Sequence, residues 1–134
     1  MFNELSPKDV YHALTENENS LLIDCRTRAE WVYVGVPDIR QTRGKLAFIE
    51  WTDITGQLNL NFVNQCQEQA SVDTEIFVIC RSGGRSAAAC MSLVQNGFEK
   101  VCNVLEGFEG DLDSQNHRSL KNGWKYCQLP WHQK

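Results

Sequence analysis

The residues most capable of chemistry lie in one short segment, 80–86, where a cysteine opens a loop that carries two adjacent glycines and two arginines. A cysteine is an effective nucleophile only as a thiolate, which is favoured at the N-terminus of a helix and beside guanidinium groups. Cys80 has both features by sequence. The expected chemistry is therefore nucleophilic attack by the Cys80 sulfur, whereas the plain alternative is a turn with Cys80 as a small buried apolar residue.

The loop after Cys80 is suited to holding an anion. Gly83 and Gly84 can adopt positive φ, so successive backbone N–H groups can turn inward around a negative charge, which the dipole of the following helix also favours. We expect such a cup to hold an anionic sulfur donor against Arg81 and Ser82, and to stabilise a persulfide on Cys80. An entombed Cys80 side chain, or loop carbonyls that face inward, would contradict this expectation.

Alternating strand-like and helix-like segments must position this loop. Continuous apolar runs are typical of strands covered on both faces, whereas helices repeat their apolar residues every three to four positions. The expected elements are helices over 7–15, 27–31, 58–70 and 86–96 and strands over 21–25, 46–51, 76–80 and 101–105. This order predicts an α/β fold with a mainly parallel central sheet flanked by helices, and ligands beyond the carboxyl ends of its strands.

Apolar spacing also predicts which side chains face the core. The helix after the loop should turn one face to the sheet, made of Ala87, Cys90, Met91 and Val94. Apolar residues in the segment after Asp111 should pin that segment across the domain, and they are Trp124, Leu129 and Trp131.

Composition narrows the class of protein. A length of 134 residues with 42% apolar content is usual for one core, so residues 1–134 are expected to form a single domain. The net charge of −4 argues against nucleic-acid binding, and no apolar run is long enough for a bilayer. The six cysteines lack zinc-site spacings and the first residues lack a signal peptide, so we expect free thiols in the cytoplasm and neither metal nor cofactor.

The segment 80–86, Cys-Arg-Ser-Gly-Gly-Arg-Ser, resembles the active-site loop of rhodanese-family sulfurtransferases. Residues 24–26 with 30–31 resemble the family's D-x-R-x-x-x-E-aromatic segment, and residues 103–108 resemble the strand and glycine turn after its active-site helix. Residues 123–131 resemble the ending of many single-domain members. The resemblance runs from about residue 6 to 131 and implies a three-layer rhodanese sandwich.

The resemblance also implies roles for particular residues. Cys80 would carry a persulfide received from thiosulfate or from a persulfide-donating protein, and would pass the outer sulfur to cyanide or to a thiol acceptor. The substrate loop would consist of Arg81, Ser82, Gly83, Gly84, Arg85 and Ser86. Arg85 would fix the loop with Asp24 as its partner. Asp24 and Arg26 are expected to be structural, because a carboxylate beside the thiolate would oppose its ionisation.

Other functions fit parts of the same pattern. A cysteine-dependent phosphatase is the main rival, but its loop has five residues between cysteine and arginine, whereas four separate Cys80 from Arg85. A thiol redox sensor would need Cys25 or Cys102 as a resolving thiol. For Cys25, the favoured interpretation is a small apolar residue buried in the core. A non-catalytic binding module is disfavoured by the intact Cys80.

Overall fold

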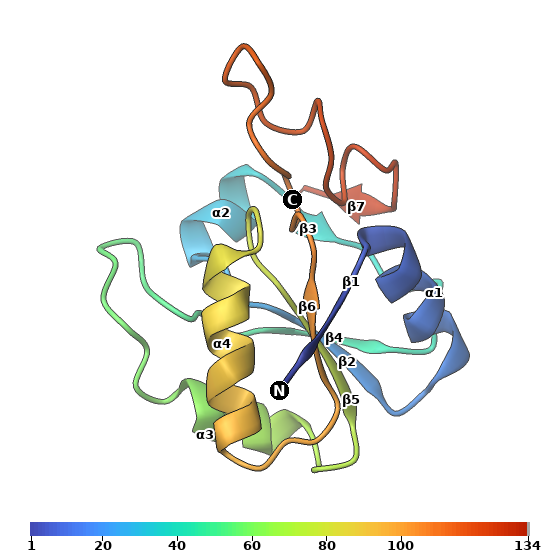
Figure 1. Cartoon of the computed structure of the whole chain (residues 1–134), viewed down its shortest axis with the longest axis vertical. Coiled ribbons are helices and arrows are strands. Elements are labelled where there is room, and N and C mark those ends of the chain that lie inside the picture. The colour runs from blue at the N-terminus through green and yellow to red at the C-terminus, as the bar shows by residue number, and fades with distance from the viewer. Residues whose placement is uncertain (134) are drawn as a thin grey trace.

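A five-stranded parallel sheet forms the middle layer of the computed structural model, which describes residues 1–133 (Figure 1). The elements in chain order are β1 (Asn3–Leu5), α1 (Pro7–Glu16), β2 (Ser20–Asp24), α2 (Arg28–Tyr33), β3 (Val36–Pro37), β4 (Lys45–Phe48), α3 (Phe62–Gln69), β5 (Glu75–Ile79), α4 (Gly84–Gln95), β6 (Val101–Val104) and β7 (Trp131–His132). The sheet order is β1-β6-β5-β2-β4, with every neighbouring pair parallel. The predicted α/β sandwich is confirmed.

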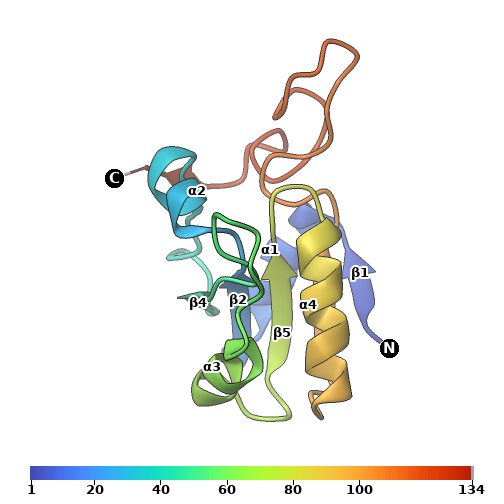
Figure 2. The same cartoon turned by 90° about the vertical axis from the view of Figure 1, so that its left-hand side faces the viewer.

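Helices cover both faces of this sheet. The buried side chains of α3 and α4 pack on one face and those of α1 on the other, where the C-terminal segment joins them (Figure 1). β5 is the central strand, and Figure 2 shows it running directly into the loop that precedes α4. The residue after β5 therefore emerges at the middle of the sheet's carboxyl edge, where ligand sites of α/β proteins form.

Two helix starts follow from their capping residues. Ser6 accepts a hydrogen bond from the Asp9 amide at 3.2 Å, which begins α1 as predicted. Thr27 and Glu30 form a reciprocal capping box at the start of α2, in which each side chain bonds the other residue's backbone. The capping box fixes the Glu30 carboxylate at the first turn of α2.

Several predicted boundaries were wrong. The helix expected over 58–70 begins only at Phe62. The residues before it pair with an earlier segment instead: Leu58 forms an antiparallel β-bridge with Thr52, and the Asn59 amide donates to the Trp51 carbonyl.

The strand expected over 46–51 is β4, which ends earlier, at Phe48. Beyond it, the amides of Ile49 and Trp51 still donate to the carbonyls of Asp24 and Cys25 at the end of β2. The strands β1, β3 and β7 were not predicted.

The buried face of α4 differs from the predicted one. Its fully covered residues are Ser86, Ala89, Cys90 and Leu93. Cys90 is shared by both sets, but Ala87, Met91 and Val94 are only half-buried. The buried face is thus shifted by about one residue from the predicted one, and it includes Ser86, whose hydroxyl lies 3.2 Å from the Cys80 sulfur.

The C-terminal segment is anchored by Trp124. This side chain is fully buried, and its indole N–H donates to the Pro130 carbonyl at 2.8 Å. Leu129 packs against the same cluster, whereas Trp131 remains 39% exposed at the surface. The predicted anchoring is confirmed, since Trp131 also pairs with Pro37 in the β3–β7 ladder and its ring lies edge-on at 6.2 Å from that of Phe108.

All six cysteines are free thiols, and only Cys127 is not buried. Within residues 1–133, no helix is long and apolar enough to cross a membrane.

A matched pair of leucines tests the observed packing. Leu93 is fully buried on α4, whereas Leu60 is 87% exposed before α3. We expect Leu93→Ala to lower the free energy of unfolding by about 2–5 kcal/mol, because a buried cavity is left behind. Leu60→Ala should change it by less than about 0.5 kcal/mol. Urea denaturation measures both, and equal effects would contradict the observed buried face of α4.

Candidate active site

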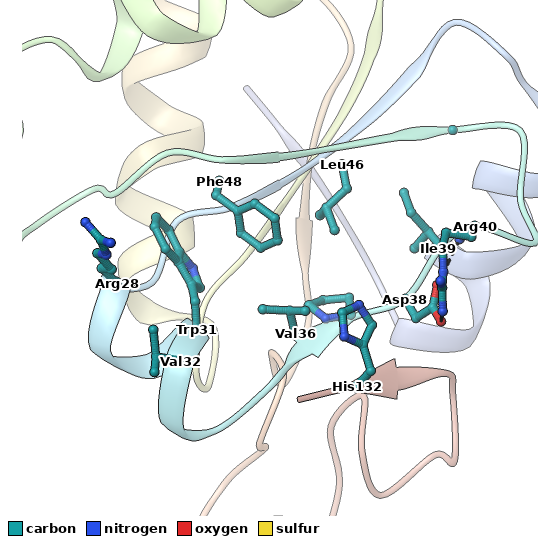
Figure 3. A pocket seen from close by; sticks show the side chains of 12 residues that line it. Arg28, Trp31, Val32, Val36, Asp38, Ile39, Arg40, Leu46, Phe48 and His132 are labelled. Atoms are coloured by element: carbon teal, nitrogen blue, oxygen red, sulfur yellow. Dashed lines mark hydrogen bonds and ion pairs between the residues drawn. The ribbon is translucent and has the colours of Figure 1, made fainter. Parts of the chain in front are cut away.

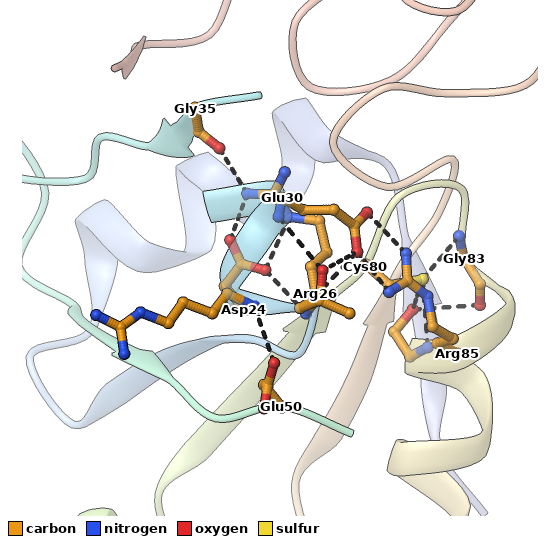
Figure 4. A network of polar contacts seen from close by, with 11 residues as sticks. Asp24, Arg26, Glu30, Gly35, Glu50, Cys80, Gly83 and Arg85 are labelled. Atoms are coloured by element: carbon orange, nitrogen blue, oxygen red, sulfur yellow. Dashed lines mark hydrogen bonds and ion pairs between the residues drawn. The ribbon is translucent and has the colours of Figure 1, made fainter. Parts of the chain in front are cut away.

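The Cys80 sulfur lies at the carboxyl end of β5, against the first turn of α4 (Figure 4). Backbone amides of Gly83 and Ser86 donate hydrogen bonds to it, at 3.1 and 3.3 Å. The Ser86 hydroxyl lies 3.2 Å from the same sulfur. Gly83 has φ of 112°, a conformation open to glycine and costly for other residues. These donors and the helix dipole favour negative charge on this sulfur.

The carbonyls at the start of the loop face away from the sulfur. Cys80 O accepts from the Phe108 amide at 2.8 Å, and Arg81 O accepts from the Glu109 amide at 3.0 Å. This contact requires Gly107, whose φ is +64°, because a Cβ there would lie 2.5 Å from both carbonyl oxygens. The turn over 106–110 therefore holds the loop from behind and leaves the amides of Gly83 and Ser86 for the sulfur.

The burial of Cys80 goes against the expectation of an accessible nucleophile, whereas the outward-facing carbonyls of Cys80 and Arg81 agree with it. Cys80 is only 1% exposed, because the loop folds over its own sulfur. Arg81 and Gly84 are exposed on the outer side of the loop, while Ser82 and Gly83 are half-buried. Access of a donor to the sulfur therefore requires the loop to move.

Arg85 fixes the loop through Glu30, not through Asp24. Its two terminal nitrogens donate to the two carboxylate oxygens of Glu30 at 2.7 and 2.9 Å. Burial acts to raise the pKa of Glu30, but the hydrogen bonds from Arg85 and Thr27 outweigh it and lower that pKa to about 2. The prediction of an Arg85–Asp24 pair was wrong, because Asp24 points to the opposite face of the sheet and has its own partner.

That partner is Arg26, and both side chains are fully buried. Arg26 donates to the two Asp24 oxygens at 2.9 and 2.7 Å, and also to the Gly35 carbonyl at 2.8 Å. Its guanidinium lies 4.3 Å from the centre of the Phe108 ring. The pair thus joins the end of β2 to the turn behind the loop, which agrees with the structural role expected for Asp24 and Arg26.

Asn103, on β6, is a site residue that sequence reasoning missed. It is 2% exposed, accepts a short hydrogen bond from the Ser86 hydroxyl and donates to the Gly83 carbonyl at 3.2 Å. It therefore holds both residues whose amides face Cys80. A polar residue within an otherwise apolar strand was the signal that could have identified it.

The two candidate resolving thiols differ in position. Cys25 lies in the same buried cluster as Cys80, between the sheet and helices α3 and α4. Cys102 lies in the cluster on the opposite face of the sheet. Burial, followed by the proximity of Cys80 and Asp24, raises the pKa of Cys25 well above its ordinary value.

A separate cavity of about 600 Å³ lies between α2, β3 and β4 (Figure 3). Its walls are mainly apolar, with Trp31, Val36, Leu46 and Phe48 pointing into it. No residue of the 80–86 loop lines it. The cavity is therefore distinct from the environment of the Cys80 sulfur.

Several known proteins are similar in sequence to this chain over most of its length. Uncharacterized protein RP600 of Rickettsia prowazekii is 35% identical over 123 residues, which are 90% of this chain and 89% of that protein. A protein of Allochromatium vinosum named sulfurtransferase is 31% identical over 107 residues, 80% of this chain and 85% of its own. The crystal structure of Rv0390 from M. tuberculosis superposes with a TM-score of 0.92 at 33% identity, covering 100% of both chains.

A rhodanese-like domain protein of Staphylococcus aureus is 18% identical, with a TM-score of 0.59 over 79% of this chain and 87% of that one, and shows likeness of fold alone. The family model described as STR4 middle domain matches residues 2–134. On this match and the relatives above 30% identity, the chain belongs to the STR4 middle domain family, with a rhodanese-like fold.

Proposed function

We propose that this protein is a sulfurtransferase in which Cys80 accepts a sulfane sulfur as a persulfide and passes it to a thiophilic acceptor. The rhodanese-like fold and a relative named sulfurtransferase support a role related to sulfur transfer. The observation that carries the finer proposal is the pair of amides, from Gly83 and Ser86, that donate to the Cys80 sulfur. Donors aimed at an anionic sulfur stabilise both a thiolate and a persulfide anion.

The proposed reaction has two displacement steps. The Cys80 thiolate attacks the outer sulfur of thiosulfate, the sulfur–sulfur bond of the donor breaks, and sulfite leaves with the electron pair. An acceptor such as cyanide or a thiolate then attacks the outer sulfur of the persulfide and releases the Cys80 thiolate. A protein persulfide could serve as donor in the first step by the same displacement.

The donor reaches the sulfur from the side of the exposed Arg81. Its guanidinium is the cation nearest in sequence to Cys80 and can attract an anionic donor to the loop. Because Cys80 is 1% exposed, the outer part of the loop must shift locally during transfer. Gly84 has no atom within 4 Å of its Cβ position, so the space beside this part of the loop is open.

The rival phosphatase function is not favoured by the loop. Four residues separate Cys80 from Arg85, and both terminal nitrogens of Arg85 are directed at Glu30. A phosphate cradle needs a longer loop and a guanidinium that faces the anion.

The free thiols favour a reducing compartment such as the cytoplasm as the place of the reaction.

Replacement of the nucleophile is the first test. Cys80→Ser should reduce thiosulfate:cyanide sulfurtransferase activity to the rate without enzyme, because a hydroxyl cannot carry sulfane sulfur. The matched control is Cys66→Ser, a buried cysteine on α3, which should retain activity. Equal turnover by wild type and Cys80→Ser would exclude Cys80 as the sulfur carrier, whereas phosphate release from aryl phosphates would favour the phosphatase.

The Glu30–Arg85 pair generates a prediction about pH. Because folding lowers the pKa of Glu30 from its ordinary 4.5 to about 2, its contribution is fully present above about pH 4.5 and is lost as the pH falls toward 2. We expect Glu30→Gln to lower the free energy of unfolding by about 1–3 kcal/mol at neutral pH. It should also reduce sulfurtransferase activity, because the loop loses its anchor.

Urea denaturation between about pH 3 and 7 measures this effect, and the gap between wild type and Glu30→Gln should narrow as the pH falls. Glu68→Gln, at an exposed position on α3, is the control and should follow the wild-type curve. A gap that stays constant over this range would show that the ionised Glu30 does not stabilise the fold.

A further inference from the structure

Cys25 and Cys80 follow two neighbouring parallel strands in the same register. Asp24 at the end of β2 is paired with Ile79 at the end of β5. The ladder continues one step further, because the Cys25 amide donates to the Ile79 carbonyl at 2.9 Å. The next residues along the two strands, Cys25 and Cys80, therefore lie side by side.

Both side chains point to the same face of the sheet. Side chains alternate along a strand, and Ile23 with Cys25 and Val78 with Cys80 all belong to the cluster beneath α3 and α4. Adjacent strands lie about 4.8 Å apart. This spacing falls within the range of about 4.4–6.8 Å between Cα atoms that a disulfide bridges. The pair therefore meets the distance condition for a disulfide, and joining the two sulfurs would require their side chains to turn toward each other.

The other cysteines are placed less favourably. Cys102 occupies the opposite face of the sheet, and Cys66 lies on α3 rather than on a strand beside β5. Cys90 shares the cluster but lies on α4, more than one helical turn beyond Gly84. Only Cys25 combines a shared face with an adjacent, in-register strand position among these thiols.

The two thiols differ in environment, which sets the order of events. Cys80 receives amide hydrogen bonds from Gly83 and Ser86, whereas Cys25 is fully buried and its pKa is raised by burial, by Cys80 and by Asp24. Cys25 therefore keeps its proton while Cys80 meets the donor. Cys80 takes up sulfur first, and Cys25 can react only afterwards.

We propose that this pair gives the protein a second activity, the reduction of sulfane sulfur to sulfide, which rests on the proposed persulfide of Cys80. When no acceptor arrives, the Cys25 proton passes to the outer sulfur of the persulfide, and the Cys25 sulfur, now a thiolate, attacks Sγ of Cys80. A Cys25–Cys80 disulfide forms, the bond between Sγ and the outer sulfur breaks, and the outer sulfur leaves as hydrosulfide. The leaving sulfur takes the electron pair and the proton of Cys25.

This step needs no external oxidant. Over uptake and release together, the sulfane sulfur gains two electrons and the two cysteine sulfurs lose one each, so the sulfane sulfur is itself the oxidant. A small thiol then reduces the disulfide by exchange and restores the site. The substrates are thus compounds that donate sulfane sulfur, such as thiosulfate, persulfides and polysulfides, and the products are sulfide and an oxidised thiol.

The test follows a single cycle in which the protein takes up one sulfur atom and then releases it. The reduced protein is treated with inorganic polysulfide or thiosulfate, freed of donor, and incubated without an acceptor while released sulfide and intact mass are measured. Wild type should first gain one sulfur atom, then release it as sulfide and end two hydrogens lighter than the reduced protein. Cys25→Val, which keeps an apolar side chain in the strand, should gain the sulfur atom and lose the sulfide release.

Controls separate this activity from folding and from the proposed function. Cys25→Ser is a second variant of near-equal volume and should behave as Cys25→Val does, and Cys66→Ser should behave as wild type. Uptake of sulfur by the Cys25 variants shows that their loop is intact. Peptide mapping should find Cys25 joined to Cys80.

Three results would overturn the inference. A wild-type persulfide that lasts as long as that of Cys25→Val excludes resolution by Cys25, while sulfur transfer itself stands. A disulfide from Cys80 to Cys90 gives the role to another thiol. If no variant takes up sulfur, the proposed function fails, and the second activity fails with it.

Discussion

The hydrogen bonds donated by the Gly83 and Ser86 amides to the Cys80 sulfur set the geometry on which the rest of the site depends. Two amides converge on one atom only if the chain reverses tightly between a strand and a helix, which the positive φ of Gly83 permits. The surrounding contacts maintain that reversal. Asn103 holds it from β6, and Gly107 allows a turn to bond its carbonyls from behind.

The second constraint is charge. An anionic sulfur near a buried carboxylate would be destabilised, and the fold avoids this by alternation along β2, which sends Asp24 to one face and Cys25 to the other. Asp24 is neutralised by Arg26, and Glu30 by Arg85. These two carboxylates thus each have their own guanidinium, and the amide dipoles remain available for the sulfur.

Sequence patterns predicted the elements whose signal is local. The apolar runs that end at Asp24 and Ile79 and the loop after Cys80 predicted the sheet and the position of the candidate site. The strands β1, β3 and β7 were missed because two or three residues show no periodicity and depend on distant partners, as Asn3 does on Cys102. The partner of Arg85 was missed for the same reason, since Glu30, on α2, is 55 residues away from it in the chain.

The near-complete burial of Cys80 also lies beyond what sequence could give, because a loop motif does not state how closely the loop covers its own sulfur. On the proposed function, burial would shield a persulfide on Cys80 from water and from unwanted thiols, and it would leave Cys25, on the adjacent strand, as the proposed reductant. The enclosure that would protect the sulfur would thus also give it the proposed second route. Transfer and reduction would then compete for one intermediate, according to the supply of acceptor.

The central claim is that one sulfane sulfur is carried on Cys80, and thiosulfate labelled in its outer sulfur tests it most directly. After brief treatment and removal of donor, proteolysis without reductant and peptide mapping locate the label. The account predicts about one label per chain, all of it on the peptide that contains Cys80. Label on another cysteine, or none at all, would contradict it.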